Sequence, residues 1–593
     1  RGIREREGGS TSTFTIPWQG MRTGDFSSQL TNNLLGTDAA GNPVYEGQIF
    51  DPTTDQMIGG ERVRTAFAGN VIPTSVQDPA SLKLLSLYPT PNTNLGERVP
   101  NDNYIIGVPL KRDVDQGDYR VDLRASDKDS LFFAGSWHES IRNRNPPLGT
   151  LDATGFAGEV QQDQPRNIMA SWTRVWTPTV LTEVRAAYTR LVTARIQANP
   201  TDDGFARLGI GGINTCAFFE QNCGIPQMNF GQYSNVGASD WLPTKEWSNV
   251  WDFIANMSIN KGAHAIKFGA EYRPVDFPFF QFPSSHGNFN FRRDYTAHPL
   301  SAGNTGDTMA STLLGSPSTG TKLSTANLIS SSFSTWSFYV QDDWKVNSKL
   351  TVNMGLRYEI YSPIDEWFGR QGNLEYWRTP VVLTIPKGNN QDAPLPPNFA
   401  DDFGEIVVER GLTDSKLIPT NYNNFAPRIG LAYQLNQKTV LRAGYGIFYG
   451  GEENEGGNPN RGEGLPFNQE VRFTTPNTTD LDQNPFIPTL SDGFPLNSFA
   501  LPAPITFRSV PERQTPFVHK WNFTLQREIG WATTLEASYI GSKGTHLKQN
   551  FNRNAAVIDP RAANLPGGPR QWLTQLIPNM GSISDTDTLG RSW

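Results

Sequence analysis

The feature that most constrains the fold of this chain is a repeated unit of two alternating strands joined by a short polar turn. In the clearest unit, alternate residues of segment 350–359 are apolar: Leu350, Val352, Met354, Leu356 and Tyr358. The residues between them are Thr351, Asn353, Gly355, Arg357 and Glu359. Because successive side chains of a strand point to opposite faces, this period of two predicts a strand with one apolar and one charged face.

The same unit occurs six times, which gives twelve strands. We predict hairpins near 118–138, 168–190, 250–273, 336–359, 426–449 and 520–539. The turn inside each hairpin is only a few residues long, whereas the segments between hairpins mostly run to about 30 to 70 residues. Outer-membrane barrels combine tight periplasmic turns with long extracellular loops in this way. A soluble sandwich or propeller rarely sorts its connections so strictly.

The chain is therefore expected to be all-β, a large antiparallel transmembrane β-barrel with long extracellular loops. Residues 116–593 are predicted to form the central part of the barrel. Residues 1–115 are predicted to hold the end of a truncated strand and a long extracellular loop with a short helix at 78–88, and another short helix is expected at 307–314.

Composition excludes two other classes of protein. No stretch approaches the roughly 18–20 apolar residues that a transmembrane helix needs, so a helical membrane protein is excluded. The formal net charge is -7 and no basic run is present, which argues against a nucleic-acid partner. The 55 Gly and 43 Pro residues fit many turns and long irregular connections.

Tyrosines end the apolar face of several return strands, about seven to ten residues past the turn. That distance is roughly the thickness of an outer-membrane hydrocarbon layer, about 25 Å, at which a tyrosine ring meets lipid and its hydroxyl meets water. Tryptophans flank the short turns at the opposite edge. The predicted membrane girdle is Trp176, Tyr188, Tyr272, Trp344, Tyr358 and Tyr539. The alternative is that these rings fill the core of a soluble β-protein.

The polar phase of the strands is expected to line a hydrated lumen, which solvates charges without requiring paired partners. Its charged members include Arg120, Asp122, Arg124, Glu183, Arg185, Lys267, Glu271, Arg357, Glu359, Arg428 and Arg442. We predict substrate contacts at Arg357, Arg428, Arg442 and at the phenylalanines Phe277, Phe279, Phe280, Phe282, Phe289 and Phe291. For each phenylalanine the alternative is packing within a loop.

The two cysteines, Cys216 and Cys223, lie close together in a loop segment without a nearby histidine or third cysteine. A zinc site is therefore disfavoured, and we predict a small loop-closing disulfide formed outside the cytoplasm. No nucleophile, phosphate-loop or metal-protease motif is present, and the six histidines are scattered. The sequence predicts no enzyme activity, no cofactor and no metal site.

Several segments resemble the TonB-dependent receptors of bacterial outer membranes. The stretch 338–346 (FYVQDDWKV) followed by 350–359 (LTVNMGLRYE) is similar to their mid-barrel signature. The Oar-like branch of that family is resembled by 21–27 (MRTGDFS), 49–52 (IFDP), 70–73 (NVIP) with 84–89 (LLSLYP), and 539–547 (YIGSKGTHL). These segments are spread over nearly the whole chain.

The resemblance implies a barrel of about 22 strands with a plug domain, and import energised through the TonB complex. The plug and TonB box are expected before Arg1 and further strands after Trp593, so the chain is interpreted as a fragment without a closing strand signal at its end. Implied partners are outer-membrane lipid and lipopolysaccharide, the TonB complex through the missing N-terminal region, and an unidentified small molecule, peptide or oligosaccharide.

The predicted function is thus uptake of a scarce extracellular substrate across the outer membrane of a Gram-negative bacterium. The alternative is a secreted or surface β-protein, propeller-like, that binds glycans or protein partners. The two differ in what covers the apolar face of segment 350–358. Lipid covers it in the first case and a second sheet in the other.

Overall fold

The computed structural model describes residues 2–592 in part. The residues outside the description are 152–159, 198–199, 213, 215, 217–222, 282–283, 326, 387–394, 396–398, 412–416, 451–466, 468, 475–487, 495–504, 510–513, 556–576 and 578–579, together with both terminal residues. None of the described helices is long and apolar enough to cross a membrane.

The predicted hairpins are confirmed as neighbours in one 16-stranded sheet of the described chain. Their strands are β6 (Tyr104–Arg124) and β7 (Asp129–Arg144), β8 (Val160–Thr177) and β9 (Val180–Ile196), β11 (Thr244–Lys261) and β12 (His264–Gln281), β15 (Ile329–Lys345) and β16 (Leu350–Tyr361), β21 (Phe425–Asn436) and β22 (Thr439–Tyr449), and β25 (Phe517–Gly530) and β26 (Thr533–Asn552). All neighbouring pairs among these twelve strands are antiparallel.

Four further strands extend this sheet. β1 (Gly2–Phe14) pairs with β6, and β27 (Met580–Ser592) pairs with β26. β24 (Ile505–Ser509) lies parallel to β27, and β17 (Asp365–Glu366) pairs with β15. The sequence of segment 580–592 shows no apolar alternation, and backbone pairing with β26 makes it a strand. Likewise β6 begins at Tyr104, so residues 104–115 belong to the wall and not to a loop.

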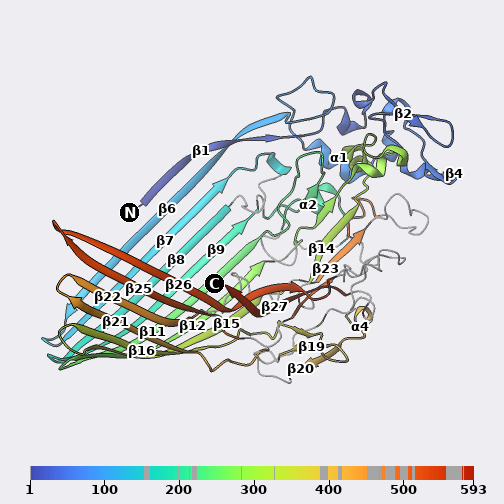
Figure 1. The fold of residues 1–593 in the computed structure, drawn as a ribbon. Helices are drawn as coiled ribbons and strands as arrows, with labels where there is room; N and C mark the ends of the chain where they lie inside the picture. Colours follow the sequence, from blue (N-terminus) through green and yellow to red (C-terminus); the bar gives the residue numbers. More distant parts are fainter. Residues whose placement is uncertain are drawn as a thin grey trace.

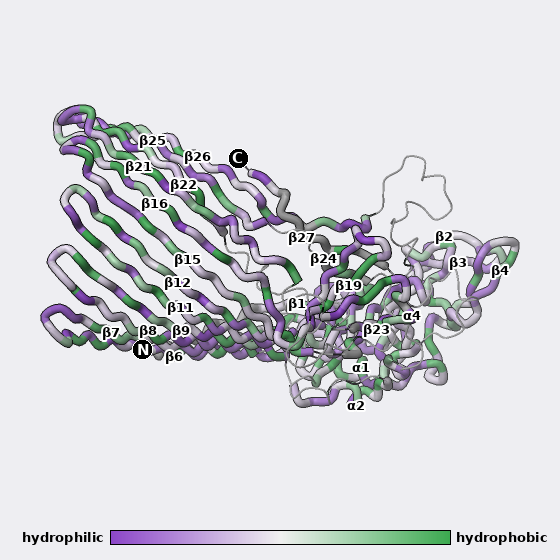
Figure 2. The backbone as a smooth tube through the Cα atoms, turned by 90° about the horizontal axis from the view of Figure 1, so that it is seen from below, coloured by the Kyte–Doolittle hydropathy of each residue, from purple (hydrophilic) through white to green (hydrophobic). Residues whose placement is uncertain are grey.

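Short and long connections lie at opposite rims of the sheet (Figure 1). The tight turns gather at one end, and the long connections carry the helices and small sheets at the other. Hydropathy alternates along the strands (Figure 2). On the apolar face Met354 is 40% and Leu356 is 42% exposed, and none of the residues 350–358 on that face is buried. The apolar face is therefore not packed against a second sheet, which excludes the propeller alternative.

The long connections fold around a hydrophobic core of their own, which we call the loop core. It joins residues from five connections, among them Ile16, Leu84, Leu148, Phe205, Phe230, Phe289, Leu313, Leu490 and Phe494. The predicted helices are confirmed as α1 (Pro79–Ser86) and α3 (Thr308–Leu313), and α2 (Gly204–Leu208) lies beside them. The small strands around this core are β2 (Leu34–Thr37), β3 (Pro43–Tyr45), β4 (Gln56–Ile58), β5 (Glu61–Val63), β10 (Gln227–Asn229), β13 (Asn288–Asn290), β14 (Thr319–Thr325) and β23 (Gln469–Thr474).

A second cluster packs the later connections. It includes Leu383, Phe403, Phe467, Phe507 and Ile583. Its elements are β18 (Asn373–Glu375), β19 (Val382–Ile385), β20 (Val407–Arg410) and α4 (Phe399–Asp402). Residues far apart in the sequence thus bury one another, so the loops are structured by non-local apolar contacts.

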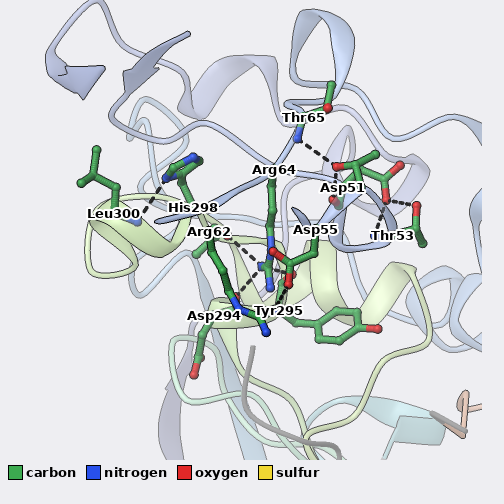
Figure 3. A network of polar contacts seen from close by, with 12 residues as sticks. Asp51, Thr53, Asp55, Arg62, Arg64, Thr65, Asp294, Tyr295, His298 and Leu300 are labelled. Carbon is green, nitrogen blue, oxygen red and sulfur yellow. Dashed lines mark hydrogen bonds and ion pairs between the residues drawn. The ribbon is translucent and has the colours of Figure 1, made fainter. Parts of the chain in front are cut away.

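A buried arginine ties the first long connection to the one after β12 (Figure 3). The Arg64 side chain has no exposed surface, and its Nη1 donates to the carbonyl oxygens of Asp294, Tyr295 and Ala297 at 3.1, 2.8 and 2.9 Å. Its Nε lies 3.6 Å from the carboxylate of Asp55, which also pairs with Arg62. Burial lowers the pKa of Arg64, and the nearby carboxylate of Asp55 opposes that shift.

Replacing the Arg64 guanidinium should destabilise the loop core without destabilising the strands of the large sheet. In an Arg64→Met variant, Asp55 loses a buried partner and three carbonyls lose their donor, so we expect the loop core to lose about 3–5 kcal/mol. Hydrogen exchange of segment 290–300 should rise while the exchange of β12 and β15 stays unchanged. Arg378→Met, which removes an exposed ion pair with Glu375 and Glu409, is the control and should change exchange little. Equal protection in the Arg64 variant and the native protein would contradict this role.

A buried histidine makes the loop core sensitive to acid. His286 is buried, and its Nε2 lies 2.9 Å from Nε2 of Gln197. Burial, and secondarily the nearby ammonium of Lys322, lower the pKa of His286 to about 3. Because the folded pKa lies below the unfolded value near 6.5, the neutral ring contributes its full stability above about pH 6.5. That contribution is lost as the pH falls from about 6.5 toward 3.

We therefore expect the stability of the loop core to fall by up to about 1.4 kcal/mol per pH unit below pH 6.5 from this group alone. Hydrogen exchange measured at pH 7.5, 6 and 5 gives the slope. His286→Gln cannot gain this proton, so its slope should be smaller over the same range. Identical slopes for the two proteins would show that His286 does not titrate in this way.

Candidate functional site

The charged phase of the strands lies on the face opposite the exposed apolar side chains. In a membrane barrel the apolar face meets lipid, so the charged face lines the lumen. We call it the inner wall. Its residues come from alternate positions of every strand, so the register of the hairpins decides which charges meet.

Arg357 is the centre of a paired network on the inner wall. Glu271, Ser337 and Glu359 lie in one row across β12, β15 and β16. The Arg357 Nε donates to Glu359 at 2.7 Å, and its Nη2 donates to Glu271 at 3.1 Å and to Ser337 at 2.7 Å. Two carboxylates therefore neutralise this guanidinium, and the substrate contact expected at Arg357 stays a prediction.

Three cations on the neighbouring strands have no such partners. Arg428 on β21, Gly446 on β22 and Lys520 on β25 lie in one row. Arg442 lies on the same face of β22, four residues nearer the tight turn, and is exposed. Among the described residues no carboxylate lies within ion-pair distance of Arg428, Arg442 or Lys520. We call these three residues the inner-wall cation group.

Phe448 fits between two members of this group. Its ring centroid lies 4.4 Å from Cζ of Arg428 and 5.5 Å from Nζ of Lys520. Glycine at position 446 leaves the room for this contact, because a Cβ there would lie 3.1 Å from the Phe448 ring and 3.3 Å from Cγ of Arg428. Arg428 and Lys520 both lie over the Phe448 ring, and neither is paired with a carboxylate of the described residues. This surface is suited to an anionic group.

The sequence analysis included Arg428 and Arg442 and missed Phe448 and Lys520. Phe448 had a detectable signal, because it is an aromatic residue in the polar phase of its strand. The pairing of β22 with β25, across a connection of more than sixty residues, is what brings Lys520 to it. No local pattern indicates that contact.

Four of the six phenylalanines predicted to contact substrate are buried. Phe289 and Phe291 are 0% and 2% exposed in the loop core, and Phe277 and Phe279, at the end of β12, are each 6% exposed with ring centroids 6.1 Å apart. Their burial favours the loop-packing alternative, because little of each ring is left to contact a ligand; substrate contact at these residues stays a prediction. Phe280 is half-buried, and Phe282 lies outside the described residues.

Four of the predicted girdle residues, Tyr188, Tyr272, Trp344 and Tyr358, make ring contacts on the apolar face. Tyr188, Trp251, Phe253, Tyr272 and Trp336 follow one another across four strands, with successive centroids 4.4, 6.0, 6.4 and 3.9 Å apart. The remaining members lie on the same face. The rings of Tyr358 and Phe425 stack with centroids 4.6 Å apart, and those of Trp344 and His264 with centroids 5.4 Å apart. Cζ of Arg174 lies 4.4 Å from the centroid of the Trp176 ring, and Tyr539 is exposed. Their role as a membrane girdle stays a prediction.

Cys216 and Cys223 are joined by a disulfide in the connection between β9 and β11. Within the described ranges no group of three or more His, Cys, Asp or Glu side chains has the arrangement to hold a metal ion.

The chain was compared with solved structures and with known protein families. Among solved structures, the chain is similar to the outer membrane transporter YddB from Escherichia coli, with 12% identity over 82% of this chain and 45% of that one and a TM-score of 0.42. The siderophore receptor PirA from Acinetobacter baumannii gives 9% identity, 82% and 49% coverage and a TM-score of 0.38. The copper transporter OprC shows 9% identity over 82% of this chain and 49% of that one, with a TM-score of 0.37. This chain thus spans about half the length of these proteins.

No curated protein sequence matches the chain. The model of the outer membrane beta barrel domain family matches residues 1–593, in agreement with the single sheet of antiparallel hairpins, the exposed apolar face and the charged inner wall. The chain belongs to the outer membrane beta barrel domain family and is a β-barrel of the Gram-negative outer membrane.

Proposed function

We propose that this barrel is a TonB-dependent transporter that takes up a scarce extracellular substrate, and that the chain has no catalytic role. The resemblance of 338–346 and 350–359 to the receptor signature supports the proposal. In the structure these two segments pair as β15 and β16 beside the Arg357 network. The TonB complex is the proposed energy-coupling partner, and outer-membrane lipid surrounds the wall.

The inner-wall cation group is the observation that carries a transport function. Unpaired cations on a lumen face cost little while water solvates them, and they attract anions into a confined space. The Phe448 ring adds an apolar surface between two of them. We therefore propose an anionic substrate with a flat or apolar part, such as a carboxylate- or phosphate-bearing small molecule, peptide or oligosaccharide.

Uptake by cells that produce the full-length protein tests the transporter class. Labelled candidates should include a ferric siderophore, cobalamin, an acidic oligosaccharide and an acidic peptide. At least one of them should accumulate in a manner that stops when an uncoupler removes the proton-motive force. A deletion strain supplies the background. Accumulation that continues unchanged after uncoupling would identify a passive pore and contradict TonB dependence.

The cation group should set the affinity for the substrate found in that assay. Arg428→Gln combined with Lys520→Gln removes both charges that flank Phe448, so we expect the half-saturation concentration of uptake to rise about tenfold or more. Arg120→Gln is the matched control, because Arg120 also covers a ring, Phe132 at 4.2 Å, but is already paired with Asp122 at 2.7 Å. An equal rise in the control, or none in the double variant, would refute a role for the cation group.

A further inference from the structure

The three residues of the inner-wall cation group start from the corners of a triangle on the inner wall. Arg428 and Lys520 lie in one row with Gly446 between them, so two strand spacings place their backbones about 10 Å apart. Arg442 lies on the strand between them, four residues or about 13 Å nearer the tight turn. All three side chains are exposed. They therefore surround one area of the sheet, which we call the inner-wall patch.

An amide side chain covers the centre of the patch. Gly444 on β22 is the register partner of Asn522 on β25. A Cβ on Gly444 would lie 3.2 Å from Oδ1 and 3.6 Å from Nδ2 of Asn522, so glycine at 444 leaves the room that this amide occupies. Asn522 is exposed, and its amide makes no hydrogen bond to the described residues. An amide that can still donate and accept thus lies among three cations.

A second glycine of the patch is not required by packing. Gly430 on β21 is the register partner of Gly444, and a Cβ on Gly430 would lie 3.8 Å from its nearest neighbours, in ordinary contact. The ladder is regular here, because the register shift between β21 and β22 lies between Gln434 and Asn436. Glycine in a strand without a bulge often marks a place where a ligand comes close to the backbone.

The carboxylates nearest to the patch in the sheet are engaged elsewhere. Asp343 lies in the row of Gly430, two strands away on β15, and accepts a hydrogen bond from Gln341 at 3.1 Å. Glu536, on β26, accepts one from Ser538 at 3.3 Å. The positive charge around the patch therefore exceeds the negative charge that the described residues bring to it.

We propose that the inner-wall patch binds a compact polyanion with two or three carboxylate or phosphate groups, and that the Asn522 amide hydrogen-bonds to the same molecule. One anionic group can pair with Arg428 and Lys520, which meet at the Phe448 ring. Arg442 starts about 13 Å away along the strand, so it pairs with a further anionic group of the ligand. This narrows the substrate class proposed above and rests on that proposed function.

The test is calorimetric titration of the full-length protein, in a non-ionic detergent at low salt, with ligands that differ only in charge number. Tricarballylate, glutarate and butyrate carry three, two and one carboxylates on the same carbon chain. Affinity should fall about tenfold for each carboxylate removed, since each makes a charge-assisted contact. Triphosphate, pyrophosphate and phosphate form the second series, and the tighter series identifies the acid. Equal affinities of the members within both series would overturn the proposal.

Arg442→Gln tests which cation binds the additional group. It should weaken tricarballylate binding about tenfold and change glutarate binding little, because the pair at Phe448 remains. Asn522→Ala should weaken both ligands. A loss of glutarate binding as large as the loss of tricarballylate binding in Arg442→Gln would contradict the assignment of a separate group to Arg442.

Gly430→Leu tests the patch without removing a charge. Its side chain covers the backbone on which the ligand lies, so tricarballylate binding should weaken about tenfold or more. Gly355→Leu is the matched control: a Cβ there has ordinary contacts from 3.4 Å, and Gly355 lies outside the triangle, across Arg428 from Gly446. An equal loss in both variants would overturn the proposal.

Heat-modifiable migration on a gel confirms that each variant is folded. Binding in detergent needs no energy coupling, so the site and the transport function can fail separately. Graded binding of the two series without energised uptake would support the site and contradict the transporter. Energised uptake without graded binding would do the reverse.

Discussion

The whole structure depends on one requirement of the bilayer: each backbone N–H and C=O inside it must be hydrogen-bonded within the protein. Antiparallel pairing of neighbouring hairpins meets that requirement along the strands from β6 to β26. Pairing also fixes the register, because a slip by one residue would turn every charged side chain toward lipid. The apolar face and the charged face therefore both follow from the same pattern of backbone hydrogen bonds between strands.

The register explains which charges on the inner wall are satisfied. Glu271 and Glu359 lie in one row, and Arg357 reaches both. The register partners of Arg428 are glycines, Gly355 on β16 and Gly446 on β22. Arg428 therefore contacts the Phe448 ring and no carboxylate of the described residues. The difference arises from residues that are far apart in the sequence and adjacent only after pairing.

This difference also explains what the sequence could predict. Period-two alternation is local, so the six hairpins, both helices and the charged face could be inferred. β27 and the first part of β6 were not inferred. Segment 580–592 is mostly polar and segment 104–110 is mostly apolar, so neither alternates clearly, and pairing with the neighbouring strand makes them strands. The roles of Phe289 and Phe291 depended on a loop core assembled from five connections. Non-local apolar contacts of that kind leave no periodic signal.

Charges that have no ion-pair partner among the described residues are the most informative residues of the wall. Charged side chains of one protein usually find each other, as Arg120 and Asp122 do at 2.7 Å. Arg428 and Lys520 face the lumen. A hydrated lumen tolerates unpaired cations, since water solvates them.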